Sequence, residues 1–218
     1  MHDLAAAREG NRITLAWTAP QRTTDRLRIE APVRFRICRQ LSAAHCANVG
    51  ARTAAPSKPG RYTDNLPATL ASGPLRQIVY EVFGLNRHGR TAGPSNPAAA
   101  LAGAAPPPVE NLTAVEVERG VVLHWRAMAA PQPGTWIELR RTLLTPPPAN
   151  HRSGQGLPVA TEPAQQILRV PASSHPGTAI DTAVEFDRKY SYVAVRIAAV
   201  TADGKRLRAD SAAGNPVV

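Results

Sequence analysis

The feature that most constrains the fold of this chain is a pattern that occurs twice. The stretch Leu4 to Trp17 and the stretch Leu112 to Trp125 have the same length, so they superpose at a constant offset of 108 positions without a gap. In each, a short strand-like segment is followed by a turn and then by apolar residues at alternate positions, the period of a half-buried β-strand. The pattern therefore predicts a duplicated, all-β protein.

The length of the chain agrees with two domains. A chain of 218 residues accommodates two units of about 100 residues, each with a modest core. The predicted boundaries are residues 2–100 for the first domain, 101–108 for an Ala/Pro linker and 109–218 for the second domain. Consecutive prolines favour the extended polyproline form, so the linker is expected to be semi-rigid. Because Asn215 to Val218 matches only the entry into a final strand, we expect an excised fragment or a domain whose edge is completed elsewhere.

The remaining strands are predicted from period-two alternation and turn residues. Residues 49–59 are expected to be an irregular connection, and Arg34 and Arg36 are expected to face outward from their strand. Gly-containing hairpins are expected at 86–89 and 202–205. The predicted strands are 3–7, 12–18, 33–37, 61–64 and 77–85 in the first repeat, and 112–117, 121–125, 136–141, 166–170 and 190–200 in the second.

The chain has only two cysteines, Cys38 and Cys46, separated by a polar segment long enough to turn a strand back on itself. In a secreted domain this pair is expected to form a disulfide, worth about 2 to 3 kcal/mol through restriction of the unfolded chain. Two free thiols remain the alternative in a reducing compartment. A metal site on Cys38, His45 and Cys46 is disfavoured because the spacing supplies too few ligands.

The order of these motifs resembles that of a fibronectin type III domain. Residues 106–114 read Pro-x-x-Val-x-Asn-Leu-x-Ala, followed by Gly-Val-x-Leu-x-Trp at 120–125, an alternating strand ending in Arg141, a Tyr-rich strand and a Gly hairpin. Both repeats show this order, and the resemblance covers nearly the whole chain. The Asp-then-Tyr strand and the Asn-Pro ending of each repeat are similar to those of tandem arrays in bacterial cell-surface or secreted lipoproteins.

The resemblance implies two tandem immunoglobulin-like, seven-stranded β-sandwiches with Trp17 and Trp125 in their cores. It also implies a tyrosine corner at Tyr80 in the first repeat and at Tyr190 or Tyr192 in the second, with Tyr80 and Tyr190 taken as core residues. The two tyrosines of the second repeat are out of phase with the apolar residues that follow, so a bulge or bend is expected there.

The chain carries 26 basic and 16 acidic residues, a formal net charge of +10, and 23 of the basic residues are arginine. Such a surplus can favour acidic partners, although a GC-rich genome also produces arginine on solvated faces. In the resembled fold two connections emerge at one end of each sandwich: the B–C loop, residues 20–31 in the first repeat, and the F–G loop, the hairpin at 86–89 in the first repeat and at 202–205 in the second. Clusters of basic residues in or beside these loops form a candidate polyanion- or partner-binding site, and solvated loop charge is the alternative. The candidate residues are Arg22, Arg26, Arg28, Arg87, His88, Arg90, Lys205, Arg206 and Arg208.

Signatures of catalysis are missing from the sequence. The chain has no Gly-x-Ser-x-Gly, His-Glu-x-x-His, Walker or Cys-x-x-Cys motif, so no enzyme activity, cofactor or metal is expected. Aromatic residues make up 5% and do not interleave with the basic loops, which disfavours nucleic acid. No apolar run is long enough to span a membrane and no signal peptide is evident.

These observations predict a non-enzymatic, extracytoplasmic interaction or spacer module of a cell-surface, periplasmic or secreted protein. It would act through loops and strand edges on another protein or a surface polysaccharide, and strand-edge pairing with neighbouring domains is also expected. The alternative is a polyanion- or carbohydrate-binding accessory domain that uses the basic B–C and F–G loops.

Overall fold

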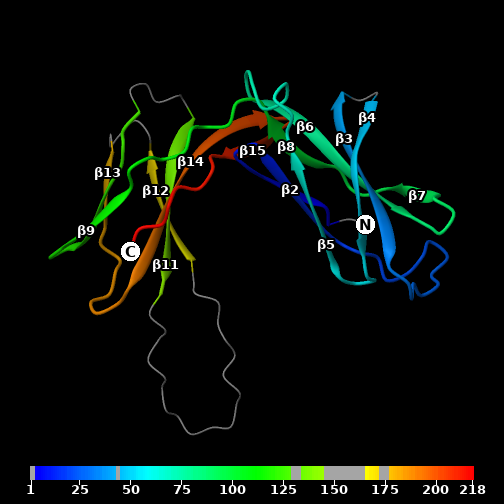
Figure 1. Cartoon of the computed structure of the whole chain (residues 1–218), viewed down its shortest axis with the longest axis horizontal. Coiled ribbons are helices and arrows are strands. Elements are labelled where there is room, and N and C mark those ends of the chain that lie inside the picture. The colour runs from blue at the N-terminus through cyan, green and yellow to red at the C-terminus, as the bar shows by residue number, and fades with distance from the viewer. Residues whose placement is uncertain (1–2, 43–44, 129–133, 145–164, 172–176) are drawn as a thin grey trace, which may run out of the picture. The chain divides into compact units, whose positions relative to one another are not determined.

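The computed structural model describes residues 3–42, 45–128, 134–144, 165–171 and 177–218, in which every regular element is a β-strand (Figure 1). The chain divides into two compact units. The first unit comprises Met1–Pro106 and Ala198–Asp210, and the second comprises Pro107–Ile197 and Ser211–Val218. In the described part, no helix is long and apolar enough to cross a membrane.

The first unit is a sandwich of two sheets. One sheet contains β1 (Ala5–Glu9), β2 (Arg12–Thr18) and β5 (Pro59–Asn65), and β15 (Lys205–Asp210) pairs in parallel with β1. The other has the order β4-β3-β6-β7, with β8 also paired to β6. Its strands are β3 (Val33–Ser42), β4 (His45–Ala54), β6 (Arg76–Leu85), β7 (Thr91–Pro94) and β8 (Ala98–Ala102).

The core of the first unit lies between these sheets, as the alternation of its strands predicts. Ile13, Leu15 and Trp17 of β2 are at most 2% exposed. The ring of Trp17 meets that of Phe35 edge to face, with centroids 5.4 Å apart. Aromatic pairs favour this geometry because the positive edge of one ring meets the negative face of the other.

The second unit repeats this plan. One sheet has the order β13-β10-β9, made of β13 (Thr178–Asp181), β10 (Gly120–His124) and β9 (Thr113–Val117). The opposite layer contains β12 (Gln165–Pro171), β11 (Thr135–Leu143) and β14 (Tyr190–Ala202). The core includes Leu123, Trp125, Ile137, Leu139 and Tyr192.

The strand registers confirm the duplication. Glu9 pairs with Arg12 in the first unit and Val117 pairs with Gly120 in the second, the same two positions at the offset of 108. The fold class is therefore all-β, with two tandem immunoglobulin-like β-sandwiches, as expected.

The predicted strand boundaries need two corrections. Residues 49–54, expected to be irregular, belong to β4, an edge strand that is held by backbone pairing to β3 and needs no apolar alternation. Leu101 and Ala102, assigned to the linker, are buried residues of β8. A run of alanines reads as a linker by composition, but here small side chains fit between the sheets beside Ile78 and Tyr80.

The segment that joins the repeats is anchored at each end by a buried arginine. In the first unit, Arg8 donates to the carbonyls of Leu101 at 3.0 Å and Gly103 at 2.6 Å. In the second unit, Arg196 donates to the carbonyls of Pro107 at 2.6 Å and Pro108 at 3.1 Å. Burial lowers the pKa of both arginines below its usual value, because the charged form loses water contacts.

Candidate functional site

The B–C loop of the first unit is a miniature hairpin that presents two arginines. The amide of Ile29 donates to the carbonyl of Gln21, and Thr23 exchanges backbone hydrogen bonds with Leu27 and Arg26. Arg26 occupies the left-handed turn position, with φ of 64°.

Arg22 and Arg28 therefore lie directly opposite each other as an antiparallel bridge pair, and both side chains are exposed. Like charges in this arrangement repel and destabilise a hairpin.

The F–G hairpin is rigidly framed by Asn86. Its side-chain oxygen accepts hydrogen bonds from the amides of His88 and Arg90, both at 2.9 Å, and its backbone pairs with Arg90 and Gly89. Gly89 has φ of 73°, the left-handed conformation that the turn requires. The Nε of Arg87 donates a hydrogen bond to the Nε2 of His88 at 3.1 Å, so the side chains of these two candidate residues contact each other.

Strand β3 brings the loop and the hairpin to one end of the sheet, because it begins after the loop and β6 ends before the hairpin. Arg34 is paired across the strands with Leu85, the last residue of β6. Arg34 and Arg36 are both exposed, as predicted, and the Arg36 guanidinium lies over the Phe83 ring at 4.9 Å from its centroid. Figure 1 shows the blue B–C loop and the green F–G hairpin at the same side of the first unit.

The B–C loop, strand β3 and the F–G hairpin carry exposed arginines at one end of the first unit, and we call these arginines the basic surface. Beside it, β4 contributes Arg52 to a shallow hollow of about 400 Å³ that Arg34 also lines. Sequence reasoning placed Arg34 and Arg36 outward but did not join them to the loops. The sequence pattern that indicates their membership is an arginine at two alternate positions of the strand that follows a basic loop. The members of the basic surface are Arg22, Arg28, Arg34, Arg36, Arg87 and Arg90.

Most arginines of the basic surface take part in no ion pair among the described residues, although Asp25 and Glu30 lie in the same loop as Arg22 and Arg28. In the described ranges, Arg22, Arg28, Arg34 and Arg90 form no ion pair with a carboxylate. The nearest acidic residue along β6, Glu81, accepts a hydrogen bond from Gln40 instead. The arrangement can therefore bind an anion with several guanidinium groups at once.

The second predicted cluster does not form a matching loop. Asp203 and Gly204 make the turn, and Lys205, Arg206 and Arg208 lie on β15, which packs with the first unit. The side chain of Arg208 is committed to Asp210, with two contacts of 2.7 and 2.8 Å. A two-residue turn places these basic residues on the strand that follows the turn and not in the turn itself.

The predicted disulfide between Cys38 and Cys46 is confirmed, with the Cα atoms 5.4 Å apart. It joins β3 to β4 and leaves no free cysteine in the described residues. No group of three or more potential metal ligands occurs within the part of the chain that the structure describes.

A buried ionic cluster joins the two sheets of the first unit. Arg39 of β3 donates to Asp64 of β5 at 2.6 Å, and the hydroxyl of Tyr80 on β6 donates to the same carboxylate oxygen at 2.6 Å. Burial, followed by the hydrogen bond to Asp64, raises the pKa of Tyr80 far above its usual value. Tyr80 is thus a core residue, but its hydroxyl contacts a side chain across the sandwich and not the upstream backbone of a tyrosine corner.

The second unit contains the same cluster. Arg141 contacts both oxygens of Asp181 at 3.0 and 2.9 Å, and the hydroxyl of Tyr192 donates to Asp181 at 3.1 Å. Burial and the Asp181 carboxylate raise the pKa of Tyr192 well above its usual value.

Tyr190 differs from its predicted role as a core residue. It is only partly buried, whereas Tyr192 is 2% exposed and Trp125 is 7% exposed. The Tyr190 hydroxyl accepts a hydrogen bond from the amide of Glu185, the upstream backbone contact expected of a tyrosine corner.

Comparison with known proteins gives only distant similarity. No protein-family model matches the chain, and no curated protein matches it. Among solved structures, the chain is similar to the FN1–FN3 domains of chicken CNTN1, at 10% identity and a TM-score of 0.39, covering 99% of this chain and 65% of that one. It is also similar to a cytokine receptor complex, at 11% identity and a TM-score of 0.39, covering 99% and 100%. A third similarity is to a two-domain fibronectin type III segment of chicken tenascin, at 9% identity and a TM-score of 0.29, covering 96% and 97%.

Proposed function

We propose that this chain is a non-enzymatic, extracytoplasmic interaction module that binds an anionic polymer, such as an acidic surface polysaccharide, through the basic surface. The observation that carries the proposal is the pairing of Arg22 directly opposite Arg28 at the end of the sheet where Arg34 lies. A like-charged pair destabilises the free protein, and an anion placed between the two arginines relieves the repulsion.

The frame of the basic surface supports this chemistry. Asn86 holds the F–G hairpin in one conformation, and stacking on Phe83 restricts Arg36. Side chains that are already ordered lose less conformational entropy on binding. Guanidinium groups also make paired hydrogen bonds to planar carboxylate or tetrahedral sulfate oxygens, which a lysine amine cannot match.

The Cys38–Cys46 disulfide supports an extracytoplasmic location for the module. Disulfides persist in oxidising compartments and are rare where thioredoxin and glutathione keep thiols reduced. Attachment of the chain to a cell-surface or secreted lipoprotein remains a part of this proposal.

The direct test is retention on a heparin matrix under a rising salt gradient. A binding variant carries Arg22→Gln, Arg28→Gln, Arg34→Gln and Arg90→Gln. A matched control variant carries Arg12→Gln, Arg61→Gln, Arg119→Gln and Arg126→Gln, four exposed arginines outside the basic surface. Both variants lose four positive charges, so a difference between them reports position and not net charge.

We expect the control to elute close to the wild type and the binding variant to elute at much lower salt. Equal elution of both variants would mean that retention follows net charge alone, and the proposal would be abandoned.

A spacer role is the second candidate, and the two buried arginine anchors favour it. Arg8 and Arg196 fix the ends of residues 101–108 onto their own units, which shortens the free part of the connection. A spacer without a ligand predicts no retention above that of other basic proteins.

A further inference from the structure

The F–G hairpin of the first unit carries a histidine, His88, between two arginines of the basic surface, Arg87 and Arg90. Its side chain is exposed, and the Nε2 of its imidazole accepts the hydrogen bond that the Nε of Arg87 donates at 3.1 Å. An imidazole nitrogen accepts a hydrogen bond only when it carries no proton, so this contact requires the neutral form of His88. The contact also engages one of the donors that the Arg87 guanidinium can offer to an oxyanion.

The backbone of the hairpin does not depend on this side-chain contact. The Asn86 side chain accepts hydrogen bonds from the amides of His88 and Arg90, and the amide of Gly89 donates to the carbonyl of Asn86. The imidazole and the guanidinium can therefore separate by side-chain rotation while the hairpin keeps its conformation.

A proton gained by His88 adds a positive charge to a region that is already basic. No carboxylate forms an ion pair with His88 in the part of the chain that the structure describes. A polyanion bound at the basic surface stabilises the protonated imidazole, and by linkage the proton strengthens binding of the polyanion to the same extent. The charged residues of the elements that meet at this end are Arg22, Asp25, Arg26, Arg28 and Glu30 of the B–C loop, Arg34 and Arg36 of β3, Arg52 of β4, and Arg87 and Arg90 of the hairpin.

We propose that His88 makes anion binding by the basic surface dependent on pH, an inference that rests on the function proposed above. The neutral imidazole accepts the hydrogen bond of Arg87 and occupies its Nε. An imidazole gains its proton between about pH 8 and pH 5. The protonated His88 can no longer accept this hydrogen bond and repels the guanidinium, so both side chains become available to the ligand. The basic surface thereby gains two cationic contacts, and the chain binds an acidic polymer more tightly in a mildly acidic medium.

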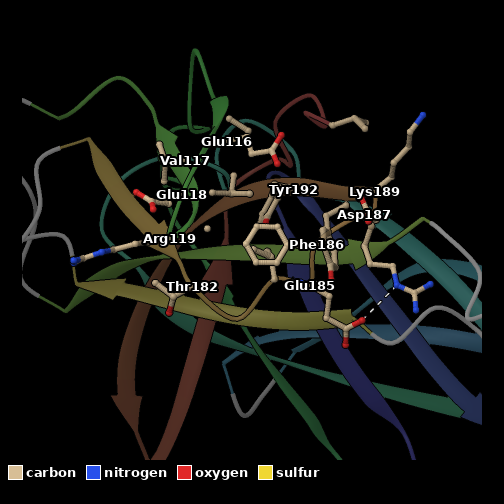
Figure 2. A pocket seen from close by; sticks show the side chains of 17 residues that line it. Glu116, Val117, Glu118, Arg119, Thr182, Glu185, Phe186, Asp187, Lys189 and Tyr192 are labelled. Atoms are coloured by element: carbon tan, nitrogen blue, oxygen red, sulfur yellow. Dashed lines mark hydrogen bonds and ion pairs between the residues drawn. The ribbon is translucent and has the colours of Figure 1, made fainter.

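The largest described hollow cannot supply this pH dependence. It lies in the second unit, has a volume of about 480 Å³ and carries charges of both signs (Figure 2). No histidine is present among its described lining residues, and carboxylates and basic side chains ordinarily keep their charge between about pH 8 and pH 5.5. Its charged residues are Glu116, Glu118, Arg119, Glu185, Asp187, Arg188 and Lys189.

The test is calorimetry of heparin binding to the whole chain at about pH 8 and pH 5.5 and constant salt. The sulfates and carboxylates of heparin stay ionised over this interval, so only the protein changes its charge. We expect the affinity of the wild type to rise about fivefold at the lower pH, the product of two exposed ion pairs of about two- to threefold each. The slope of log affinity against log salt should become steeper by about 1 to 2.

Two substitutions of His88 imitate its two protonation states. The amide oxygen of glutamine can accept from Arg87 but cannot gain a proton, so His88→Gln should lose most of the rise. His88→Lys carries its charge at both pH values and should already have the tighter affinity at about pH 8.

Two further variants separate the contact from the titration of histidine in general. Arg87→Gln should cost little at about pH 8 and about two- to threefold in affinity at about pH 5.5, where Arg87 is released. The matched control is His124→Gln, which removes an exposed histidine of the second unit and should keep the wild-type response to pH.

An equal rise in the wild type and His88→Gln, or no gain for His88→Lys at the higher pH, would overturn this inference and leave anion binding by the basic surface intact. Absence of heparin binding at both pH values would overturn the proposed function, and this inference with it.

Discussion

Removing the carboxylate of the buried cluster in the first unit should be among the most damaging single changes there. Asp64→Asn leaves the Arg39 guanidinium without its counter-charge, and the side chains of the pair are only 7% and 12% exposed. Loss of one partner of a buried ion pair costs about 3 to 5 kcal/mol. Arg39 has little to compensate this loss, because its Nε is already buried without a hydrogen-bond partner. Tyr80→Phe removes only one hydrogen bond to the carboxylate and should cost about 1.5 to 3 kcal/mol.

Urea unfolding at neutral pH measures both costs. The fluorescence of Trp17 reports the first unit in a background with Trp125→Phe and Trp136→Phe. With a slope of about 2 kcal/mol per molar urea, the midpoint should fall by about 2 M for Asp64→Asn and by about 1 M for Tyr80→Phe. Adding Arg39→Met to Asp64→Asn should recover part of the loss, since no charge is then left buried. A cost below about 1 kcal/mol for Asp64→Asn, or a larger cost for Tyr80→Phe, would refute the reasoning.

Three further changes test other parts of the fold. The folded-state pKa of Tyr80 and Tyr192 is raised above the unfolded value near 10, so their stabilising contribution is complete below pH 10 and is lost as the pH rises toward the folded value. Unfolding free energy should therefore decline above pH 10, and the double Tyr→Phe variant should show a flatter decline in a pH series of urea titrations. Cys46→Ser should lower the unfolding free energy of the first unit by about 2 to 3 kcal/mol, because the disulfide closes a short loop in the unfolded chain, and wild type in reducing agent should match it. Arg8→Met should release the carbonyl of Leu101 and speed amide exchange along β8 more than along β2, as hydrogen exchange can measure.

The duplication was predictable because its two signs, alternating apolar residues within a strand and equal spacing of the motifs, can be read from short stretches of the sequence. The two core tryptophans and the outward arginines of β3 followed from the same period. The alanine-rich β8 was not predictable in this way, since alanine has little preference between strand and linker. Its strand character depends on pairing with β6, a contact between distant parts of the sequence.

The buried clusters were missed for a different reason. The alternation that places Phe35 and Ile37 inward continues to Arg39, and that of Ile137 and Leu139 continues to Arg141. An arginine in an inward phase signals a buried ion pair, but its carboxylate partner comes from a strand distant in the sequence, which the local pattern does not identify.

Glu138 shows the limit of the alternation. It occupies the outward phase of β11 yet is 0% exposed, and it accepts a hydrogen bond from Trp136 and pairs with Arg140 and Arg169. Burial on this face depends on neighbouring side chains that no single-strand pattern contains.

The candidate site likewise has features that follow from local sequence patterns and features that depend on contacts in the folded chain. Loop positions of Arg22, Arg28, Arg87 and Arg90 followed from the turn residues and the resemblance. The pairing of Arg22 opposite Arg28 depends on hairpin contacts inside the B–C loop, and the position of the second cluster on β15 depends on a tight turn.

The central claim, anion binding by the basic surface, is tested most directly by the salt dependence of heparin affinity in calorimetry. Each cation that contacts a polyanion releases a counterion, so the slope of log affinity against log salt counts contacts. We predict that the double variant Arg22→Gln and Arg28→Gln lowers the slope by about 1 to 2 and weakens binding. The same slope as the wild type, with Arg12→Gln and Arg61→Gln producing an equal loss of affinity, would contradict the claim.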